Sequence, residues 1–91
     1  MKIAQIQMHV SGDKTADLRH AAELIRGAGE IDLAVLPEMF CCPYDNSCFH
    51  RYGEEAGGEA QQALSALARE RGIWLIGGSI PELEDGNVYN T

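Results

Sequence analysis

The chain has 91 residues, of which 45% are hydrophobic and 23% charged, and its formal net charge at pH 7 is -7. This length fits one small domain or a part of a larger one. The negative charge argues against binding to nucleic acid or to an anionic membrane surface, because both interactions need a basic protein surface. The longest apolar run is also too short to span a bilayer.

The sequence begins with a strand-like segment and shows no signal peptide, so we expect a cytoplasmic protein. Its three cysteines, Cys41, Cys42 and Cys48, fall within one short segment. An odd number of cysteines without a secretion signal favours free thiols over a disulfide framework. Adjacent cysteines also fit poorly to the usual spacing of metal ligands, so we expect no metal site at these thiols and His50.

The first part of the chain predicts a strand, a helix and a second strand. Residues 2–8 alternate between apolar and more polar side chains, as in a strand with two different faces. Residues 14–28 carry an apolar stripe with helical spacing, and Asp13 is a suitable N-cap. Residues 31–36 form an almost unbroken apolar run, which is typical of a central strand in a parallel sheet. Two strands joined by a helix in this way form a right-handed βαβ unit.

A second unit of this kind follows a long irregular segment. Residues 39–56 lack periodicity, apart from a short helical turn that we expect near residues 47–52. A helix is predicted over Glu59–Arg71, with Gly72 as its stop signal, and a short buried strand over residues 73–76. The order of elements therefore predicts an α/β fold that opens as βαβαβ with mainly parallel strands.

Three shorter segments complete the sequence. Gly77-Gly78-Ser79 predicts a loop whose glycines allow close approach of another backbone segment or a ligand. The acidic residues 81–86 predict a turn, and residues 87–91 predict the start of another strand. Because these elements would leave at least one sheet edge uncovered, we expect a truncated chain that forms the opening portion of a larger α/β domain.

Glu38 is the candidate catalytic residue because it follows the predicted central strand. Pro37 cannot continue a strand ladder, so Glu38 lies just past the carboxyl end of the strand. Ligands and catalytic side chains gather at this edge of open α/β sheets. We expect the carboxylate to be partly desolvated against Met39 and Phe40, which would make it a better proton acceptor and a general base. The alternative is an ordinary surface glutamate at the end of a strand.

Three sequence motifs resemble those of one known family, the carbon–nitrogen hydrolases of the nitrilase superfamily. They are Leu36-Pro37-Glu38-Met39-Phe40, Gly77-Gly78-Ser79-Ile80-Pro81-Glu82 and Val88-Tyr89-Asn90-Thr91. Together with Cys42-Pro43-Tyr44, they are most similar to the ω-amidase-like branch, which removes ammonia from monoamides of dicarboxylic acids. The resemblance covers the whole chain and implies that residues 1–91 are the N-terminal portion of a single domain of this family.

The resemblance also implies a four-layer α-β-β-α sandwich and a Glu–Lys–Cys catalytic triad, with Glu38 as the glutamate. In this family the glutamate takes a proton from the cysteine thiol, the thiolate attacks an amide or nitrile carbon, and the lysine stabilises the oxyanion. Neither Lys2 nor Lys14 matches the lysine of the family, and none of the three cysteines lies where the nucleophile is expected. The 91 residues alone are therefore expected to be inactive.

Phe40 and Tyr44 are the candidate substrate-binding residues, because both are aromatic and follow Glu38 closely. Core packing is the alternative for Phe40. We expect a small-molecule amide as substrate, no cofactor, and a homo-oligomer. Two other functions stay open. One is a small α/β binding or assembly module without activity, stable only when its open sheet edge pairs with another copy or another subunit, and the other is a flavodoxin-like nucleotide-binding module. The second lacks support, because Gly77-Gly78-Ser79 has neither the spacing nor the lysine of a phosphate loop.

Overall fold

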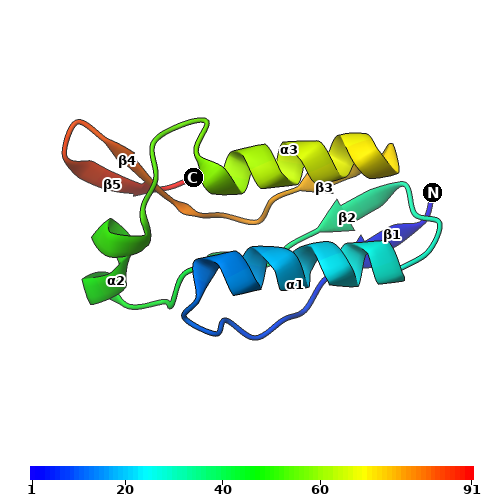
Figure 1. Ribbon diagram of the computed structural model, residues 1–91, viewed down its shortest axis with the longest axis horizontal. Coiled ribbons are helices and arrows are strands. Elements are labelled where there is room, and N and C mark those ends of the chain that lie inside the picture. Colours follow the sequence, from blue (N-terminus) through cyan, green and yellow to red (C-terminus); the bar gives the residue numbers. More distant parts are fainter.

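Two helices cover one face of a three-stranded parallel sheet in the computed structural model, which describes residues 1–91 (Figure 1). The strands are β1 (Ile3–Gln5), β2 (Leu33–Val35) and β3 (Trp74–Ile76), in the order β1-β2-β3. The connections between them contain the helices α1 (Lys14–Gly27) and α3 (Glu59–Arg71). The predicted βαβαβ opening, with parallel strands and β2 in the centre, is confirmed.

The strands of this sheet are shorter than the apolar runs that predicted them. β1 has three residues, although the strand was predicted over residues 2–8, and β2 lacks both ends of the predicted 31–36 strand. The ladder nevertheless reaches one residue beyond β2, where the amide of Leu36 donates to the carbonyl of Ile76 at 2.9 Å. Pro37 has no amide hydrogen and cannot extend it further.

Local sequence determines where the two long helices begin and end. The side chain of Asp13 caps α1 as predicted, because it accepts a hydrogen bond from the amide of Ala16 at 3.1 Å. α1 ends at Gly27, with Ala28 as its C-cap. Gly72 ends α3 in the left-handed conformation, with φ of 63°. No helix of the chain has the length and apolar character needed to cross a membrane.

The hydrophobic core lies between the two long helices and the sheet. Its buried members come from both helices, from β2 and from the segments that follow β2 and β3: Leu18, Ala21, Ile25, Ala34, Leu36, Phe40, Cys41, Ala60, Leu67 and Ile80. The opposite face of the sheet is open to solvent, since Ile3, Trp74 and Ile76 are 58%, 77% and 53% exposed. The strand register places these three side chains on one face.

The segment after β3 forms a β-hairpin, so the turn predicted for residues 81–86 is wrong in extent. β4 (Pro81–Glu84) pairs with β5 (Asn87–Asn90) as a separate antiparallel sheet. Only Asp85 and Gly86 lie between these strands, and their φ angles are 51° and 81°. Two consecutive positive φ angles are what a tight type I′ hairpin turn requires. The Asp-Gly pair was therefore the sequence signal for this hairpin.

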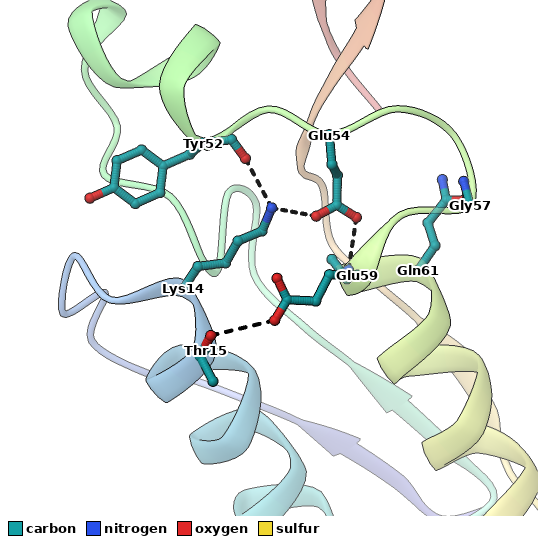
Figure 2. Close-up of polar contacts among 8 residues, drawn as sticks. Lys14, Thr15, Tyr52, Glu54, Gly57, Glu59 and Gln61 are labelled. Carbon is teal, nitrogen blue, oxygen red and sulfur yellow. Dashed lines mark hydrogen bonds and ion pairs between the residues drawn. The ribbon is translucent and has the colours of Figure 1, made fainter.

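A nearly buried ion pair joins the start of α1 to the start of α3 (Figure 2). Lys14 Nζ pairs with Glu54 Oε2, and it also donates to the carbonyl of Tyr52 at 3.0 Å. Tyr52 is the last residue of α2 (Asn46–Tyr52), which corresponds to the helical turn predicted in this segment. Glu54 Oε1 accepts a hydrogen bond from the amide of Ala60, in the first turn of α3, at 2.8 Å. One lysine and one glutamate thus connect all three helices.

Removing one partner of this ion pair should destabilise the fold more than removing an exposed pair. The side chains of Lys14 and Glu54 are only 19% and 10% exposed. Lys14→Met would leave the glutamate carboxylate without its counter-ion, so we expect the free energy of unfolding to fall by about 2–4 kcal/mol. Urea denaturation followed by circular dichroism measures this change.

Arg26→Met is the matched control, because Arg26 and Glu70 form an ion pair in which both side chains are about half exposed. Solvent screens such a pair, so its loss should change stability much less than the Lys14 substitution does. Equal effects of the two substitutions would contradict the role given to the Lys14–Glu54 pair.

Candidate functional site

Glu38 lies at the carboxyl edge of the parallel sheet, where the sequence placed it. β2 ends at Val35, its last ladder bond is made by Leu36, and Glu38 follows two residues later. β3 is the parallel neighbour of β2, so the segment that begins at Gly77 leaves the sheet at the same edge. In open α/β sheets this edge is where ligands bind.

The side chain of Glu38 is exposed, so the predicted desolvation of this carboxylate is wrong. The two neighbours expected to cover it, Met39 and Phe40, are themselves buried, with 4% and 0% of their surface exposed. The backbone explains the difference, because Met39 has a left-handed φ of 50° and turns the chain sharply after Glu38. The turn buries Phe40 in the main core and Met39 in a smaller cluster with Cys42 and Cys48, and it leaves the carboxylate outside.

The segment that leaves β3 holds this turn in place. The hydroxyl of Ser79 accepts a hydrogen bond from the amide of Met39 at 3.1 Å. Gly78, with φ of 60°, lies directly against Pro37, because a Cβ at this glycine would overlap the proline carbonyl oxygen and lie 2.7 Å from its carbon. The glycine loop therefore allows the close backbone approach predicted for it, and the segment it approaches is the one that carries Glu38.

The carboxylate of Glu38 has one polar partner, the side chain of Asn90 in β5. Asn90 Nδ2 donates a hydrogen bond to Glu38 Oε1 at 2.8 Å. No lysine, arginine or histidine forms an ion pair with Glu38. Sequence reasoning missed Asn90, which lies 52 residues further along the chain. The Asp85-Gly86 turn was the available signal, because a tight hairpin pairs Asn90 with Pro81 and so brings it back towards β3.

A small hollow of about 100 Å³ opens next to this turn, lined by Met39, Tyr44, Phe49, Val88, Tyr89 and Asn90. Tyr44 packs edge-on against Phe49, with 5.6 Å between ring centroids, and it is 74% exposed. The structure therefore places Tyr44 where a ligand could reach it. Phe40 is fully buried in the main core and does not line this hollow, which corresponds to the core-packing alternative.

A larger, open hollow of about 360 Å³ lies where β1 and β2 end, lined by Gln5, Ile6, Gln7, Val35, Leu36 and Pro37. Glu38 thus lies in the chain between Pro37, which lines the larger hollow, and Met39, which lines the smaller one. The smaller hollow is linked to the carboxylate, because Asn90 both lines this hollow and donates to Glu38 Oε1.

The three cysteines are free and buried, as expected for structural thiols. Burial raises the pKa of the Cys41 thiol to about 12. Burial also raises the pKa of the Cys42 thiol. Because the thiolate is the reactive form, neither of these residues is a suitable nucleophile. No group of three or more histidine, cysteine, aspartate or glutamate side chains is arranged to hold a metal ion.

Comparison with known proteins relates the whole chain to one family. The family model for carbon–nitrogen hydrolases matches residues 2–91. Over 92 residues the chain is 44% identical to the omega-amidases of Mus musculus and Danio rerio and 41% identical to that of Homo sapiens. Each match covers 99% of this chain and 33% of the relative. The chain therefore spans about one third of the length of the curated relatives it matches.

Solved structures show the same relationship. A Saccharomyces cerevisiae protein of branch 10 of the nitrilase superfamily matches with a TM-score of 0.89 at 37% identity, over 99% of this chain and 37% of the other. A protein of the superfamily from Xanthomonas campestris matches with a TM-score of 0.88 at 22% identity, over 99% of this chain and 34% of the other. The second match concerns the fold alone.

Substitution of Gly78 should disturb the turn that carries Glu38. Gly78→Ala places a Cβ against the backbone of Pro37, whereas Gly86→Ala, also at a positive φ, meets no atom within 4 Å. Both substitutions should cost about 1–2 kcal/mol of unfolding free energy from backbone strain, and Gly78→Ala a further 1–3 kcal/mol or so from overlap. Urea denaturation compares them, and equal losses would contradict the close contact.

Cys41 should resist alkylation in the folded chain. Burial raises its pKa from 9.0 to about 12, so its thiolate fraction near pH 8 is about a thousandfold below that of an ordinary thiol. We expect iodoacetamide to modify it slowly there, with a rate that rises with pH up to about 12. Mass spectrometry of peptides from native and guanidinium-unfolded protein measures this. Equal rates in the two states would contradict the burial of Cys41.

Proposed function

Because the chain belongs to the carbon–nitrogen hydrolase family, we propose that it supplies the general base, Glu38, of an ω-amidase-like hydrolase of small monoamides. The observation that carries this proposal is the position of Glu38, at the carboxyl edge of the sheet and hydrogen-bonded to Asn90, which lines the smaller hollow. The family match extends over the whole of this site.

In the proposed reaction Glu38 takes the proton from the thiol of a cysteine, and the thiolate attacks the amide carbon of the substrate. A lysine stabilises the tetrahedral oxyanion, and the leaving nitrogen receives the proton and departs as ammonia. Water then hydrolyses the thioester, which gives the free acid and regenerates the thiol. The cysteine and the lysine of this triad match no position of the 91 residues, so we propose that Glu38 is the only triad member among them.

The surroundings of Glu38 leave one carboxylate oxygen available to accept a proton. No cation pairs with the carboxylate, and its second oxygen, Oε2, takes part in no hydrogen bond. The exposed oxygen is therefore free to accept a proton from a thiol that approaches from outside these residues.

The open face of the sheet supports the four-layer sandwich that the family resemblance implies. Ile3, Trp74 and Ile76 form an apolar surface on this face, opposite the side covered by α1 and α3. Apolar surface of this kind marks a site of packing against another layer. We propose that a second sheet covers it, as in the sandwich expected for the family.

The relatives named as omega-amidases favour the hydrolase over the binding or assembly module left open by the sequence. A small-molecule monoamide is the substrate we propose. Formation of a homo-oligomer and a cytoplasmic location stay predictions.

A chimeric enzyme tests the proposed role of Glu38. Residues 1–91 would replace the matching third of the Mus musculus omega-amidase, and ammonia release from succinamate would be measured. We expect the chimera to be active and Glu38→Gln to lower kcat by about 10²–10⁴-fold, the usual contribution of a general base. Glu84→Gln, at an exposed glutamate of β4, is the control and should change kcat little.

Retention of full activity by the Glu38→Gln chimera would contradict the proposal. The 91-residue chain should release no ammonia by itself, because one triad member cannot form an acyl-enzyme. Ammonia release by this chain that Glu38→Gln abolishes would show that the expected inactivity is wrong.

A further inference from the structure

We infer that Asn90 is a positioning residue for Glu38, an inference that rests on the proposed role of Glu38 as the general base. Asn90 Nδ2 donates to Glu38 Oε1 at 2.8 Å, and this is the only hydrogen bond of the carboxylate. The contact fixes one oxygen of an otherwise exposed side chain. It therefore limits the directions in which the second oxygen can point.

Asn90 is held firmly enough to orient another side chain. It pairs with Pro81 at the end of the β4–β5 hairpin. The next pair along the chain, Ile80 and Thr91, exchanges backbone hydrogen bonds of 2.8 and 3.0 Å in the two directions. Ile80 is 6% exposed and Pro81 less than 2%. The backbone of Asn90 is therefore anchored to a buried segment on the partner strand.

The chemistry of an amide suits this task. A general base must come within about 2.6–3.2 Å of the proton that it removes, so its orientation matters. Lysine or arginine in the place of Asn90 would also orient the carboxylate, but a positive charge would make it a weaker proton acceptor. The neutral amide donates one hydrogen bond and carries no charge. It can hold Glu38 without neutralising it.

Asn90 and Ser79 form hydrogen bonds with two neighbouring residues, Glu38 and Met39. Ser79 holds the backbone amide of Met39, directly after Glu38, whereas Asn90 holds the carboxylate itself. Both residues belong to the segment that follows β3. Asn90 also lines the small hollow that contains Tyr44, so the residue that orients the base borders a place where a ligand could bind.

The contact itself can be tested by NMR on the full chain, independently of catalysis. The side-chain amide resonances of Asn90 should move in Glu38→Ala, because this substitution removes the carboxylate that accepts its hydrogen bond. The side-chain amide of Asn87, on the same strand, should resonate alike in both proteins. Unchanged Asn90 side-chain resonances in Glu38→Ala would overturn the inference.

The consequence for catalysis is tested in the chimera described above. Asn90→Ala should lower kcat about tenfold or more with KM changed less than about twofold, because the base is misplaced and not removed. Asn90→Asp keeps the size of the side chain but adds a negative charge. An ionised carboxylate cannot donate to Glu38 and repels it, so this substitution should lower kcat at least as much as Asn90→Ala does. Asn90→Gln, which keeps the donor, should restore part of the rate.

Asn87→Asp is the matched control, because it adds the same charge to an exposed position of the same strand and should leave kcat unchanged. If Glu38→Gln is inactive but Asn90→Ala and Asn90→Asp behave as the unmodified chimera, the inference is wrong and the proposed function stands. If Glu38→Gln keeps its activity, the proposed function itself is wrong.

Discussion

The contact between Gly78 and Pro37 is the constraint on which the rest of the site depends. β2 and β3 are parallel neighbours, so their chains leave the sheet side by side at its carboxyl edge. The absence of a side chain at Gly78 lets the two backbones touch, and Ser79 then accepts the hydrogen bond of the Met39 amide. The left-handed conformation of Met39 follows from this arrangement. The segment that follows the neighbouring strand β3 therefore positions Glu38.

Two carboxylates near this end of the fold have different environments. Glu54 is almost buried, paired with Lys14, and bonded to the first turn of α3, so it links the helices that cover the sheet. Glu38 is exposed and meets only the neutral amide of Asn90. A carboxylate neutralised by a buried ammonium is a poor proton acceptor, whereas an exposed one without a cation is free to act as a base. The contrast supports a structural role for Glu54 and the proposed catalytic role for Glu38.

Local patterns in the sequence were sufficient to predict much of the fold. The apolar stripes of α1 and α3, the Asp13 cap and the Gly72 stop depend on residues within a few positions of one another, and the structure confirms them. The exposure of Glu38 depends on a contact between segments about 40 residues apart, which fixes the φ of Met39. The hydrogen bond to Asn90 depends on hairpin register. Such long-range geometry is not encoded in the spacing of neighbouring residues, so these features were missed.

The central claim is that the segment leaving β3 holds the turn that carries Glu38. Hydrogen exchange at the amide of Met39 tests this claim most directly. The amide donates to Ser79 Oγ at 3.1 Å, so it should exchange slowly in the unmodified chain. In Ser79→Ala it should exchange fast, while the amides within the three-stranded sheet keep their protection. Fast exchange of Met39 in both proteins, with the sheet protected, would show that the turn is not held and would contradict the account.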